Sequence, residues 1–320
     1  MLRETGRLLV RRSDLKDKCM YLNRDCPACR AQPALTRTAV SATTRAESQS
    51  IRQLREYWRG FRSDSTFFTY VRCQSCYFIY CGTYFSDDQL QELYAFMPDN
   101  TNDVDLDLLR KTQSGYQRQI ASYGFSGSRV LDVGADIGLL AEAIRQHDSS
   151  VVVDAIEPNR GVHDTLQAAL GSSGHVVGSW AGLPTDARYD LIAGIHVLDH
   201  LIDLSQAVQE VVGRIRPGGH IYFVTHNERS LMRRLLGRRW PPFCLQHPHL
   251  FDQRTLKRVF ENAGFVDVRV RRTTNHFSLR HIARVATQLL GLPARVATVV
   301  PPLALPLKLG NISVQGRWPG

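Results

Sequence analysis

Downstream of residue 128, short apolar runs alternate with amphipathic stretches along the chain. Apolar runs of this length predict strands, which we place at 129–134, 151–158, 175–180, 189–197, 220–227, 266–272 and 311–318. Helical stretches lie between them at 139–147, 162–170, 204–215 and 252–265, and the last three carry apolar residues at i, i+3 and i+4 spacing. Strands that alternate with helices predict a doubly wound α/β domain, with a seven-stranded sheet covered on both faces.

The region before this domain has a different character. Six of the seven cysteines and many aromatic residues fall between Cys19 and residue 85. Residues 86–122 have a helical pattern, and Ser86 suits the N-cap of the helix that SDDQLQELYAF predicts. We therefore expect three units: an N-terminal domain at 1–85, a helical linker at 86–122 and the α/β domain at 123–320.

The stretch VLDVGADIGLL, residues 130–140, has the pattern of a strand that runs into a glycine turn and then a helix. Such a turn lets the backbone approach a ligand closely, and the helix N-terminus adds hydrogen-bond donors. Asp132, Gly134 and Gly138 occupy the turn, while Asp136 stands where D-x-G-x-G-x-G spacing would place the middle glycine. Glu157 follows Gly138 by 19 residues, close to the ~20 expected of an acid that binds ribose hydroxyls. The turn and the acid predict a nucleotide-like ligand.

Read in order, these motifs resemble the class I S-adenosylmethionine (SAM) dependent methyltransferases. VLDVGADIG resembles their first motif, IEP the acidic end of the second strand, and YDLIAGIHVLDHL the fourth-strand motif. IRPGGHIYFVTHN resembles the fifth strand with its turn, and HLFDQRTLKRVFENAGF the helix before the sixth strand. The resemblance covers about residues 125–320 and implies a Rossmann-like methyltransferase sheet.

The resemblance also implies roles for the matching positions. Gly134 and Gly138 would line the methionine part of SAM, and Asp132 would orient the turn or reach the SAM ammonium. Glu157 would hold the ribose. Ile195, at the end of the fourth strand, would edge the methyl-transfer site.

Two positions depart from the family pattern. Asp136 replaces a glycine, although aspartate tolerates a positive φ better than most residues, and its carboxylate could face the SAM ammonium. Trp180 stands near the point where the family often has an acid that contacts the adenine. Trp180 either stacks on the adenine or belongs to the core, and the sequence does not decide between these two.

The cysteines form two C-x-x-C pairs, Cys26 with Cys29 and Cys73 with Cys76. Two such pairs can present four thiolates to a zinc ion, although Cys73 follows Cys29 by 44 positions, more than compact zinc fingers use. The alternatives are a redox pair or buried thiols. CPAC…YVRCQSCYFIY before a SAM domain resembles a zinc ribbon of bacterial sugar C-methyltransferases and glycan-cluster enzymes, which implies a structural Zn²⁺. The remaining thiols are expected to be buried and inert: Cys19, Cys81 and Cys244.

Histidine is the natural base near neutral pH for an acceptor that must lose a proton. The candidates are His196, His200, His226, His247 and His249. QHPHLF resembles a stretch of the sugar C-methyltransferases in which a histidine faces the acceptor. Our hypothesis is therefore that His249 or His247 acts on the acceptor, with His196 near the methyl group. Full turnover in both His249→Ala and His247→Ala would refute it.

The net charge of +10 and pI near 9.5 suit nucleic acid, phosphorylated metabolites or an anionic membrane, without choosing among them. Residues 229–242 carry several arginines, so a phosphate-bearing or lipid-linked acceptor fits. The apolar stretch 289–307 holds an arginine and four prolines, which disfavours a spanning helix but allows peripheral membrane contact. The N-terminus lacks the apolar core of a secretory signal, so a cytoplasmic protein is expected.

The reading that we favour is SAM-dependent methylation of a small molecule, such as a sugar, a glycan precursor or a secondary metabolite. An RNA methyltransferase is one alternative, suggested by the basic charge and the zinc ribbon. However, IHVL stands after the fourth strand in place of an N-P-P-Y signature, so nucleic acid is the weaker reading. The other alternative is a non-catalytic module that keeps the fold but does not bind SAM.

Overall fold

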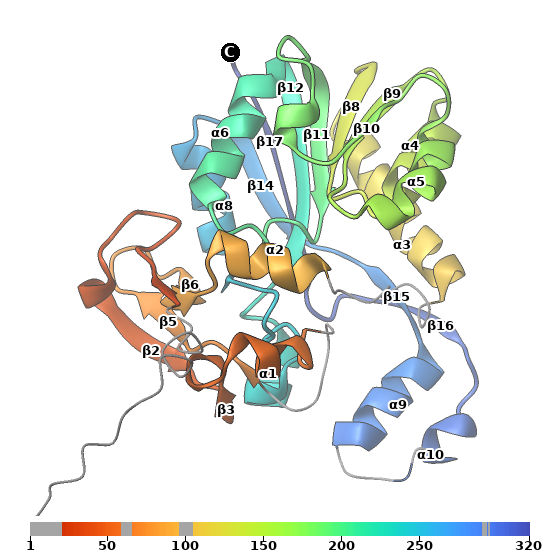
Figure 1. The fold of residues 1–320 in the computed structure, drawn as a ribbon. Coiled ribbons are helices and arrows are strands. Elements are labelled where there is room, and N and C mark those ends of the chain that lie inside the picture. The colour runs from red at the N-terminus through yellow and green to blue at the C-terminus, as the bar shows by residue number, and fades with distance from the viewer. Residues whose placement is uncertain (1–20, 59–65, 96–104, 290–292, 294) are drawn as a thin grey trace, which may run out of the picture.

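The seven strands expected from the sequence form one sheet in the computed structural model, which describes residues 21–58, 66–95, 105–289, 293 and 295–320. Their order is β10 (Val176–Val177), β9 (Val152–Ile156), β8 (Arg129–Val133), β11 (Tyr189–Ile195), β12 (Ile215–His226), β17 (Asn311–Arg317) and β14 (Val266–Arg272) (Figure 1). All neighbouring strands are parallel except β17, which is antiparallel to β12 and β14. The segment between β14 and β17 leaves and re-enters the sheet at the same end, so β17 runs back between its neighbours.

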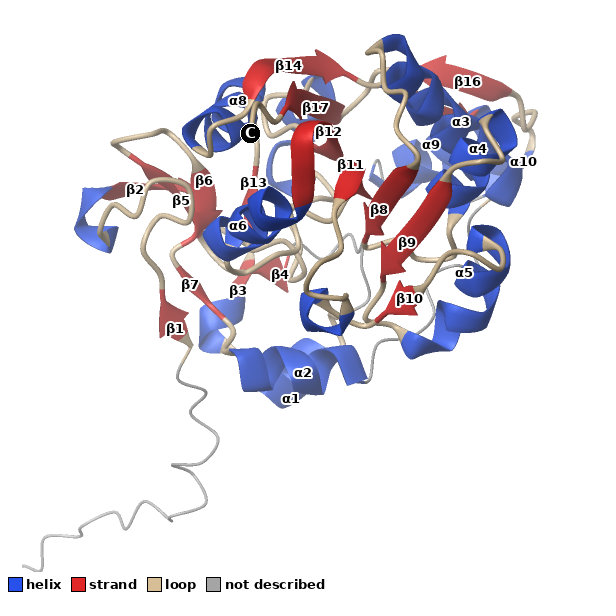
Figure 2. Cartoon of the chain, turned by 90° about the horizontal axis from the view of Figure 1, so that it is seen from above, coloured by secondary structure: helices blue, strands red, loops and turns tan. Residues whose placement is uncertain are grey.

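Helices cover both faces of this sheet, as the alternating pattern predicts (Figure 2). One face packs against α6 (Leu204–Arg214) and α8 (Gln253–Asn262), and the other against α3 (Leu106–Ser122), α4 (Leu139–His147) and α5 (His163–Leu170). Neighbouring residues of a strand point to opposite faces. Leu131 of β8 accordingly joins the core beneath α6 and α8, whereas Val130 joins the core beneath α3, α4 and α5.

The cysteine-bearing region forms a second sheet in the order β13, β6, β5, β2. Its strands are β2 (Thr36–Val40), β5 (Tyr70–Cys73), β6 (Ile79–Cys81) and β13 (His249–Leu250). Strand β13 comes from the stretch expected to belong to the α/β domain, so the two parts of the chain share a sheet. The half-buried guanidinium of Arg24 adds to this junction, because it donates to the carbonyls of Ile202 at 2.7 Å and Pro248 at 3.2 Å.

The remaining elements surround these two sheets. Ser86 caps helix α2 (Asp87–Ala95) as expected, since its hydroxyl accepts from the Gln89 N–H at 3.4 Å and its own N–H donates to Gln89 Oε1 at 2.8 Å. The other elements are β1 (Leu22–Asn23), β3 (Thr44–Arg45), α1 (Ile51–Arg55), β4 (Thr66–Phe67), β7 (Thr83–Tyr84), α2 (Asp87–Ala95), α7 (Leu231–Leu236), β15 (Asn275–Ser278), α9 (Leu279–Leu289), α10 (Arg295–Thr298) and β16 (Ala304–Leu307).

The apolar stretch 289–307 contains α10 and β16, and β16 pairs antiparallel with β15. Within the described part of the chain, no helix combines the length and the apolar character needed to cross a bilayer. Cys19, one of the thiols expected to be buried, lies outside the described residues.

Candidate active site and cysteine cluster

The turn between β8 and α4 has the backbone shape that its glycines require. Gly134 and Gly138 have φ values of 68° and 81°, a region that L side chains rarely adopt. A Cβ on Gly134 would lie 3.0 Å from Val197 Cγ2, and one on Gly138 would lie 2.7 Å from Ala169 Cβ. Both glycines therefore allow close packing of the turn, Gly134 against the segment after β11 and Gly138 against α5.

Asp136 adopts the same left-handed region as these glycines, with φ 49°. Aspartate is among the few residues that enter this region at low cost. Its backbone N–H donates to Glu157 Oε2 at 2.9 Å. The departure from the glycine pattern thus leaves the turn intact, and a contact between the Asp136 carboxylate and SAM stays a prediction.

Asp136→Gly tests that contact. We expect stability to stay within about 1 kcal/mol, because relief of left-handed strain offsets the greater freedom of glycine in the unfolded chain. We expect the Kd for SAM to rise roughly tenfold, since a charge-assisted hydrogen bond is lost. Calorimetric titration of both proteins with SAM measures this, and unchanged or tighter binding would argue against a specific contact.

Glu157 follows β9 directly and is only 9% exposed. Its Oε2 accepts from the Asp136 N–H at 2.9 Å, and its Oε1 accepts from the Asn159 N–H at 2.8 Å. These bonds fix the carboxylate beside the glycine turn. Since each carboxylate oxygen can accept a further hydrogen bond, the geometry fits the expected role of holding a ribose diol.

Asp132, on β8, is 1% exposed, and its Oδ2 has no hydrogen-bond partner among the described residues. Burial, and secondarily the charge of Glu157, raises the pKa of Asp132 to about 8. A cationic ligand beside this group would offset its burial. The carboxylates of Asp132 and Glu157 therefore suit SAM, which carries a sulfonium and an ammonium.

The raised pKa of Asp132 makes stability depend on pH. The folded protein keeps a proton on Asp132 up to about pH 8, whereas the unfolded chain loses it at about pH 3.9. The stabilising contribution is therefore complete below about pH 3.9 and falls progressively until the pH passes about 8. Urea unfolding at several pH values is expected to show this decline in the wild type and a flatter profile in Asp132→Asn.

The exposed Asp186 provides a control for this prediction, since Asp186→Asn is expected to leave the decline of stability with pH unchanged. Equal profiles for the wild type and Asp132→Asn would contradict the prediction.

Trp180 is half-buried and begins a short 3₁₀ turn soon after β10. Together with Val133, Val197 and Leu198, it lines a small cavity of about 10 Å³. Its position is compatible with both of the alternatives that the sequence leaves open. Ile195 is the last residue of β11 and is partly buried, so it lies at the strand end where we expected it.

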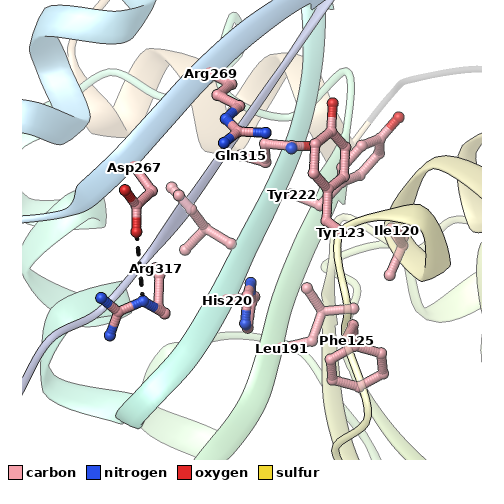
Figure 3. Close-up of a pocket in the computed structure, with 12 residues that line it drawn as sticks. Ile120, Tyr123, Phe125, Leu191, His220, Tyr222, Asp267, Arg269, Gln315 and Arg317 are labelled. Carbon is pink, nitrogen blue, oxygen red and sulfur yellow. Dashed lines mark ion pairs between the residues drawn. The ribbon is translucent and has the colours of Figure 1, made fainter.

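A larger cavity of about 270 Å³ lies elsewhere (Figure 3). It is lined by residues that include Tyr123, Leu191, His220 and Arg269. Leu191, near the N-terminal end of β11, pairs with His220 in the middle of β12, so the cavity lies away from the carboxyl ends of these strands. Ligands of open α/β sheets bind outside the carboxyl ends of the strands, so the glycine turn is the better candidate site despite the size of this cavity.

Several histidines gather around Asp199 beyond the ends of β11 and β12. Asp199 is fully buried, and its Oδ2 contacts His226 Nδ1 and accepts from the His226 backbone N–H at 3.3 Å. The rings of His196 and His226 lie 4.4 Å apart between centroids. His247 Nε2 lies 3.2 Å from His200 Nε2, and the His247 ring is 5.0 Å from that of His226.

Of the three histidines predicted to be catalytic, His196 and His247 thus lie in this cluster, whereas His249 has other neighbours. His249 is fully buried, its Nε2 lies 2.8 Å from the Leu198 carbonyl oxygen, and its ring packs against Phe78 and Phe251. Burial, helped by the charge of Arg24, lowers the pKa of His249 to about 3. These contacts join β13 to the end of β11.

Asp199 was not among the site residues expected from the sequence. The spacing of HVLDHL, which places His196, Asp199 and His200 around one turn, could have indicated a polar cluster there. Asp199 pairs with His226, the last residue of β12. Its nearness to Asp199 follows from the parallel pairing of β11 and β12.

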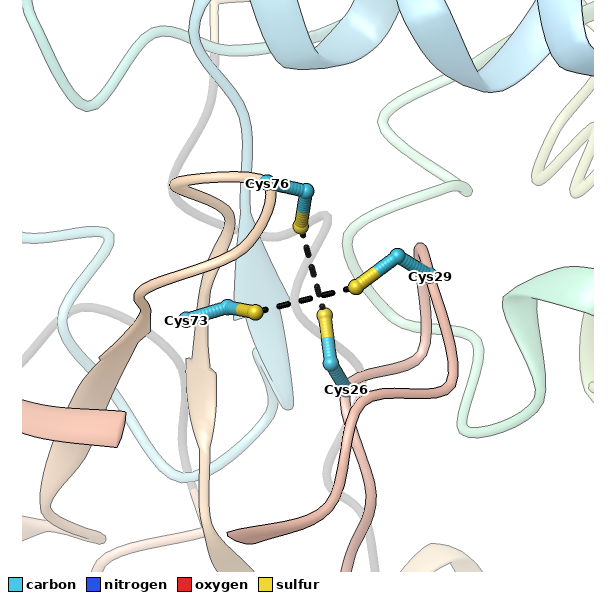
Figure 4. A group of neighbouring side chains, drawn as sticks. All are labelled: Cys26, Cys29, Cys73 and Cys76. Atoms are coloured by element: carbon cyan, nitrogen blue, oxygen red, sulfur yellow. Dashed lines mark hydrogen bonds between the residues drawn. The ribbon is translucent and has the colours of Figure 1, made fainter. Parts of the chain in front are cut away.

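The four cysteines of the C-x-x-C pairs converge (Figure 4). Cys26 Sγ lies 3.5 Å from Cys76 Sγ, and Cys29 Sγ lies 3.6 Å from Cys73 Sγ. All four sulfur atoms lie within 4.8 Å of one another. Sulfur atoms bound to zinc at about 2.3 Å in a tetrahedron have a similar spacing, roughly 3.8 Å, so the donor set fits a Zn²⁺ ion. Cys81 and Cys244 are buried outside this cluster, as expected.

The sheet order, the glycine turn and the acid after β9 define the class I SAM-dependent methyltransferase domain. The chain belongs to the methyltransferase domain family, whose model matches residues 107–270. This match begins inside the stretch that the sequence predicts as a helical linker.

Curated relatives match shorter parts of the chain. A ubiquinone biosynthesis O-methyltransferase of Rhizobium etli is 33% identical over 104 residues, which are 32% of this chain and 42% of that protein. The protein with the same name in Chelativorans sp. is 26% identical over 156 residues, or 46% of this chain and 62% of that protein. The chain thus spans less than two thirds of the length of either relative.

The solved structures similar to this chain are more distant in sequence. The SAM-dependent methyltransferase SibL, in its apo form, aligns with a TM-score of 0.48 and 14% identity over 72% of this chain and 59% of that chain. A SAM-dependent methyltransferase of Archaeoglobus fulgidus aligns with a TM-score of 0.44 and 16% identity over 65% of this chain and 94% of that chain.

Proposed function

We propose that this protein transfers a methyl group from SAM to a small-molecule acceptor, such as a sugar, a glycan precursor or a secondary metabolite. The observation that carries the proposal is the contact between two sites. The glycine turn after β8 packs against Val197 through Gly134, and Val197 directly follows His196 of the histidine cluster. A methyl donor on the turn would therefore lie beside a group of polar side chains suited to an acceptor.

SAM supplies an electrophilic methyl group when bound. The backbone at Gly134 and Gly138 shapes the turn, Asp136 offers negative charge to the ammonium, and Glu157 accepts hydrogen bonds from the ribose. Asp132, which keeps its proton up to about pH 8 in the free protein, would lose that proton to solvent when the ammonium binds and so add a second negative charge. Ile195 edges the transfer site, and Trp180 either stacks on the adenine or packs in the core.

The proposed acceptor side is formed by His196, His247 and His249, of which His247 or His249 acts on the acceptor. His247 Nδ1 lies 2.7 Å from the Pro242 carbonyl oxygen, so this nitrogen carries the proton and the ring orientation is fixed. His249 contacts the Leu198 carbonyl oxygen and so holds β13 beside the segment after β11. A substitution of His249 would therefore disturb the structure close to the proposed transfer site.

The proposed role of the cysteine cluster is structural. Cys26, Cys29, Cys73 and Cys76 would hold Zn²⁺, which stabilises the sheet that includes β13. The same sheet is tied to the region after β12 by an ion pair, with Arg72 Nη2 3.0 Å from Glu228 Oε1. The metal would thereby fix the N-terminal unit against the acceptor side.

The arginines after β12 remain the basis for a phosphate-bearing or lipid-linked acceptor. Arg233 and Arg234 lie in the last turn of α7, and Arg238 and Arg239 directly follow in a 3₁₀ turn. Leu231 and Leu235 of α7 are 65% and 73% exposed, which also suits peripheral contact with a membrane. We place such a protein in the cytoplasm, where SAM and nucleotide-linked sugars are available.

A methyl-transfer assay with labelled SAM tests the proposal. Nucleotide-sugars, phosphorylated sugars and total RNA are offered as acceptors to the wild type, His247→Ala, His249→Ala and the control variant His281→Ala on α9. We expect label on a small molecule and loss of turnover in His247→Ala or His249→Ala. Label on RNA alone would instead support the RNA methyltransferase reading.

A further inference from the structure

The polar cluster beyond β11 and β12 has the composition of a second metal site. One ring nitrogen each of His196 and His226 and one carboxylate oxygen of Asp199 all lie within 4.8 Å of one another. Two imidazoles with one carboxylate form a ligand set that proteins use for divalent first-row transition metals. This set shares no residue with the cysteine cluster.

Burial of the carboxylate points to a cation. Asp199 is 0% exposed, and a buried charge is costly unless it is paired and hydrogen-bonded. Its Oδ2 is satisfied by His226, but its Oδ1 has no hydrogen-bond partner within the described residues. The Nδ1 atom of His196 is likewise buried without a partner among those residues. A bound cation would satisfy both atoms.

The backbone and the surrounding side chains position these groups. His196 has φ 55°, and strained non-glycine conformations of this kind concentrate at functional sites. Its N–H donates to the Val224 carbonyl at 2.8 Å, and its Nε2 lies 3.1 Å from the side-chain amide of Asn311. Because an amide can be rotated to present its oxygen, Asn311 can accept from the Nε2–H of His196. That leaves the Nδ1 lone pair as a ligand, an orientation typical of metal-binding histidines.

We infer that His196, Asp199 and His226 bind a divalent transition metal ion beside the methyl-transfer site. Metal bonds of about 2.0–2.2 Å place ligand atoms roughly 3.4 Å apart. Binding therefore separates Asp199 from its direct contact with His226, and a proton held by the ligating nitrogen passes to solvent. The His226 side chain is 12% exposed, so the site can be reached by an ion.

An ion at this position has open coordination sites for an oxygen of the acceptor. This role in acceptor binding rests on the proposed function, whereas the binding of the ion itself does not. The metal ion would therefore be a second cofactor, located on the acceptor side, and it would favour acceptors that carry an oxygen atom able to bind it.

Cobalt titration of the full chain tests the inference. The zinc-loaded protein is first dialysed against a weak chelator, and Co²⁺ is then added while visible absorption and calorimetric heat are recorded. We expect one equivalent of Co²⁺ with a spectrum of nitrogen and oxygen ligands and no sulfur-to-cobalt charge transfer. Asp199→Asn and His226→Gln are expected to weaken this binding by roughly 100-fold or more, beyond the effect of losing an outer-sphere partner. The control His281→Gln is expected to bind like the wild type.

Circular dichroism establishes that each variant is folded. If the variants unfold, the titration of the wild type alone decides. The proposal is overturned if the wild type does not bind one equivalent of Co²⁺ through nitrogen and oxygen ligands. Equal binding by folded wild type, Asp199→Asn and His226→Gln would also overturn it. Calorimetric titration with SAM distinguishes this failure from failure of the proposed function, because SAM binding without cobalt binding rejects only the metal site.

Discussion

Cys76→Ser is expected to abolish zinc binding at the cysteine cluster and to unfold the N-terminal sheet. Structural zinc sites contribute about 10–16 kcal/mol of apparent binding free energy at neutral pH in small domains, which equals or exceeds the net stability of about 5–15 kcal/mol of a typical domain. Cys76 is 6% exposed and its Sγ lies 3.5 Å from that of Cys26, so serine removes one ligand from a closed set. Because β13 pairs with β6, the stretch around His249 is expected to lose order as well.

Cys81→Ser is the matched control for this prediction. Cys81 lies on β6 and is buried like Cys26, Cys73 and Cys76, but it is not one of the four converging thiols. We expect it to retain zinc and to lose only a modest part of the stability. The measurement is the intensity of the sulfur-to-cobalt charge-transfer band after metal exchange, together with thermal unfolding. Retention of that band and of the melting temperature in Cys76→Ser would contradict a zinc site built from the four cysteines.

Glu157→Ala is expected to raise the Kd for SAM by roughly 100-fold or more, because hydrogen bonds to a charged group are worth about 1.5–3 kcal/mol each. Two such bonds to the ribose hydroxyls would be lost. The substitution also removes the acceptor for the N–H groups of Asp136 and Asn159, which loosens the glycine turn. Equilibrium dialysis with labelled SAM measures the change.

Glu157→Gln and Glu261→Ala separate the contributions to that loss. Glutamine keeps one acceptor oxygen without the charge, so an intermediate loss of roughly tenfold is expected. Glu261 lies on α8, where it is exposed and pairs with Lys257, so Glu261→Ala is expected to bind SAM like the wild type. If Glu157→Ala also bound SAM with wild-type affinity, the acid after β9 would have no part in the cofactor site.

Strands β8, β9 and β11 were predictable because most of their residues are apolar over a length that suits a buried strand. The direction of β17 was not, since it depends on the path of residues 273–310 in space. The sequence placed the start of β12 at residue 220, but the strand begins at Ile215. Pro217 and two glycines in IRPGGH suggested a turn, yet Ile215 pairs with Tyr189 across an irregular register.

The candidate site was predictable to the extent that its residues are close along the chain. The glycine turn and the acid after β9 follow from local spacing, and the two C-x-x-C pairs by themselves indicate a zinc site. Asp199 and His226 are 27 positions apart, so only the parallel pairing of β11 with β12 brings them into contact. Strand β13 has two residues, too short for a pattern, and its place in the cysteine-bearing sheet depends on tertiary packing.

Calorimetric titration of the chain with SAM and with its demethylated product tests whether this protein is a SAM-dependent enzyme. We expect one binding site for both ligands, formed by the turn after β8 and by Glu157, with weakened binding in Glu157→Ala and retained binding in Glu261→Ala. If the folded, zinc-loaded chain bound neither ligand, it would be a non-catalytic module that keeps only the fold.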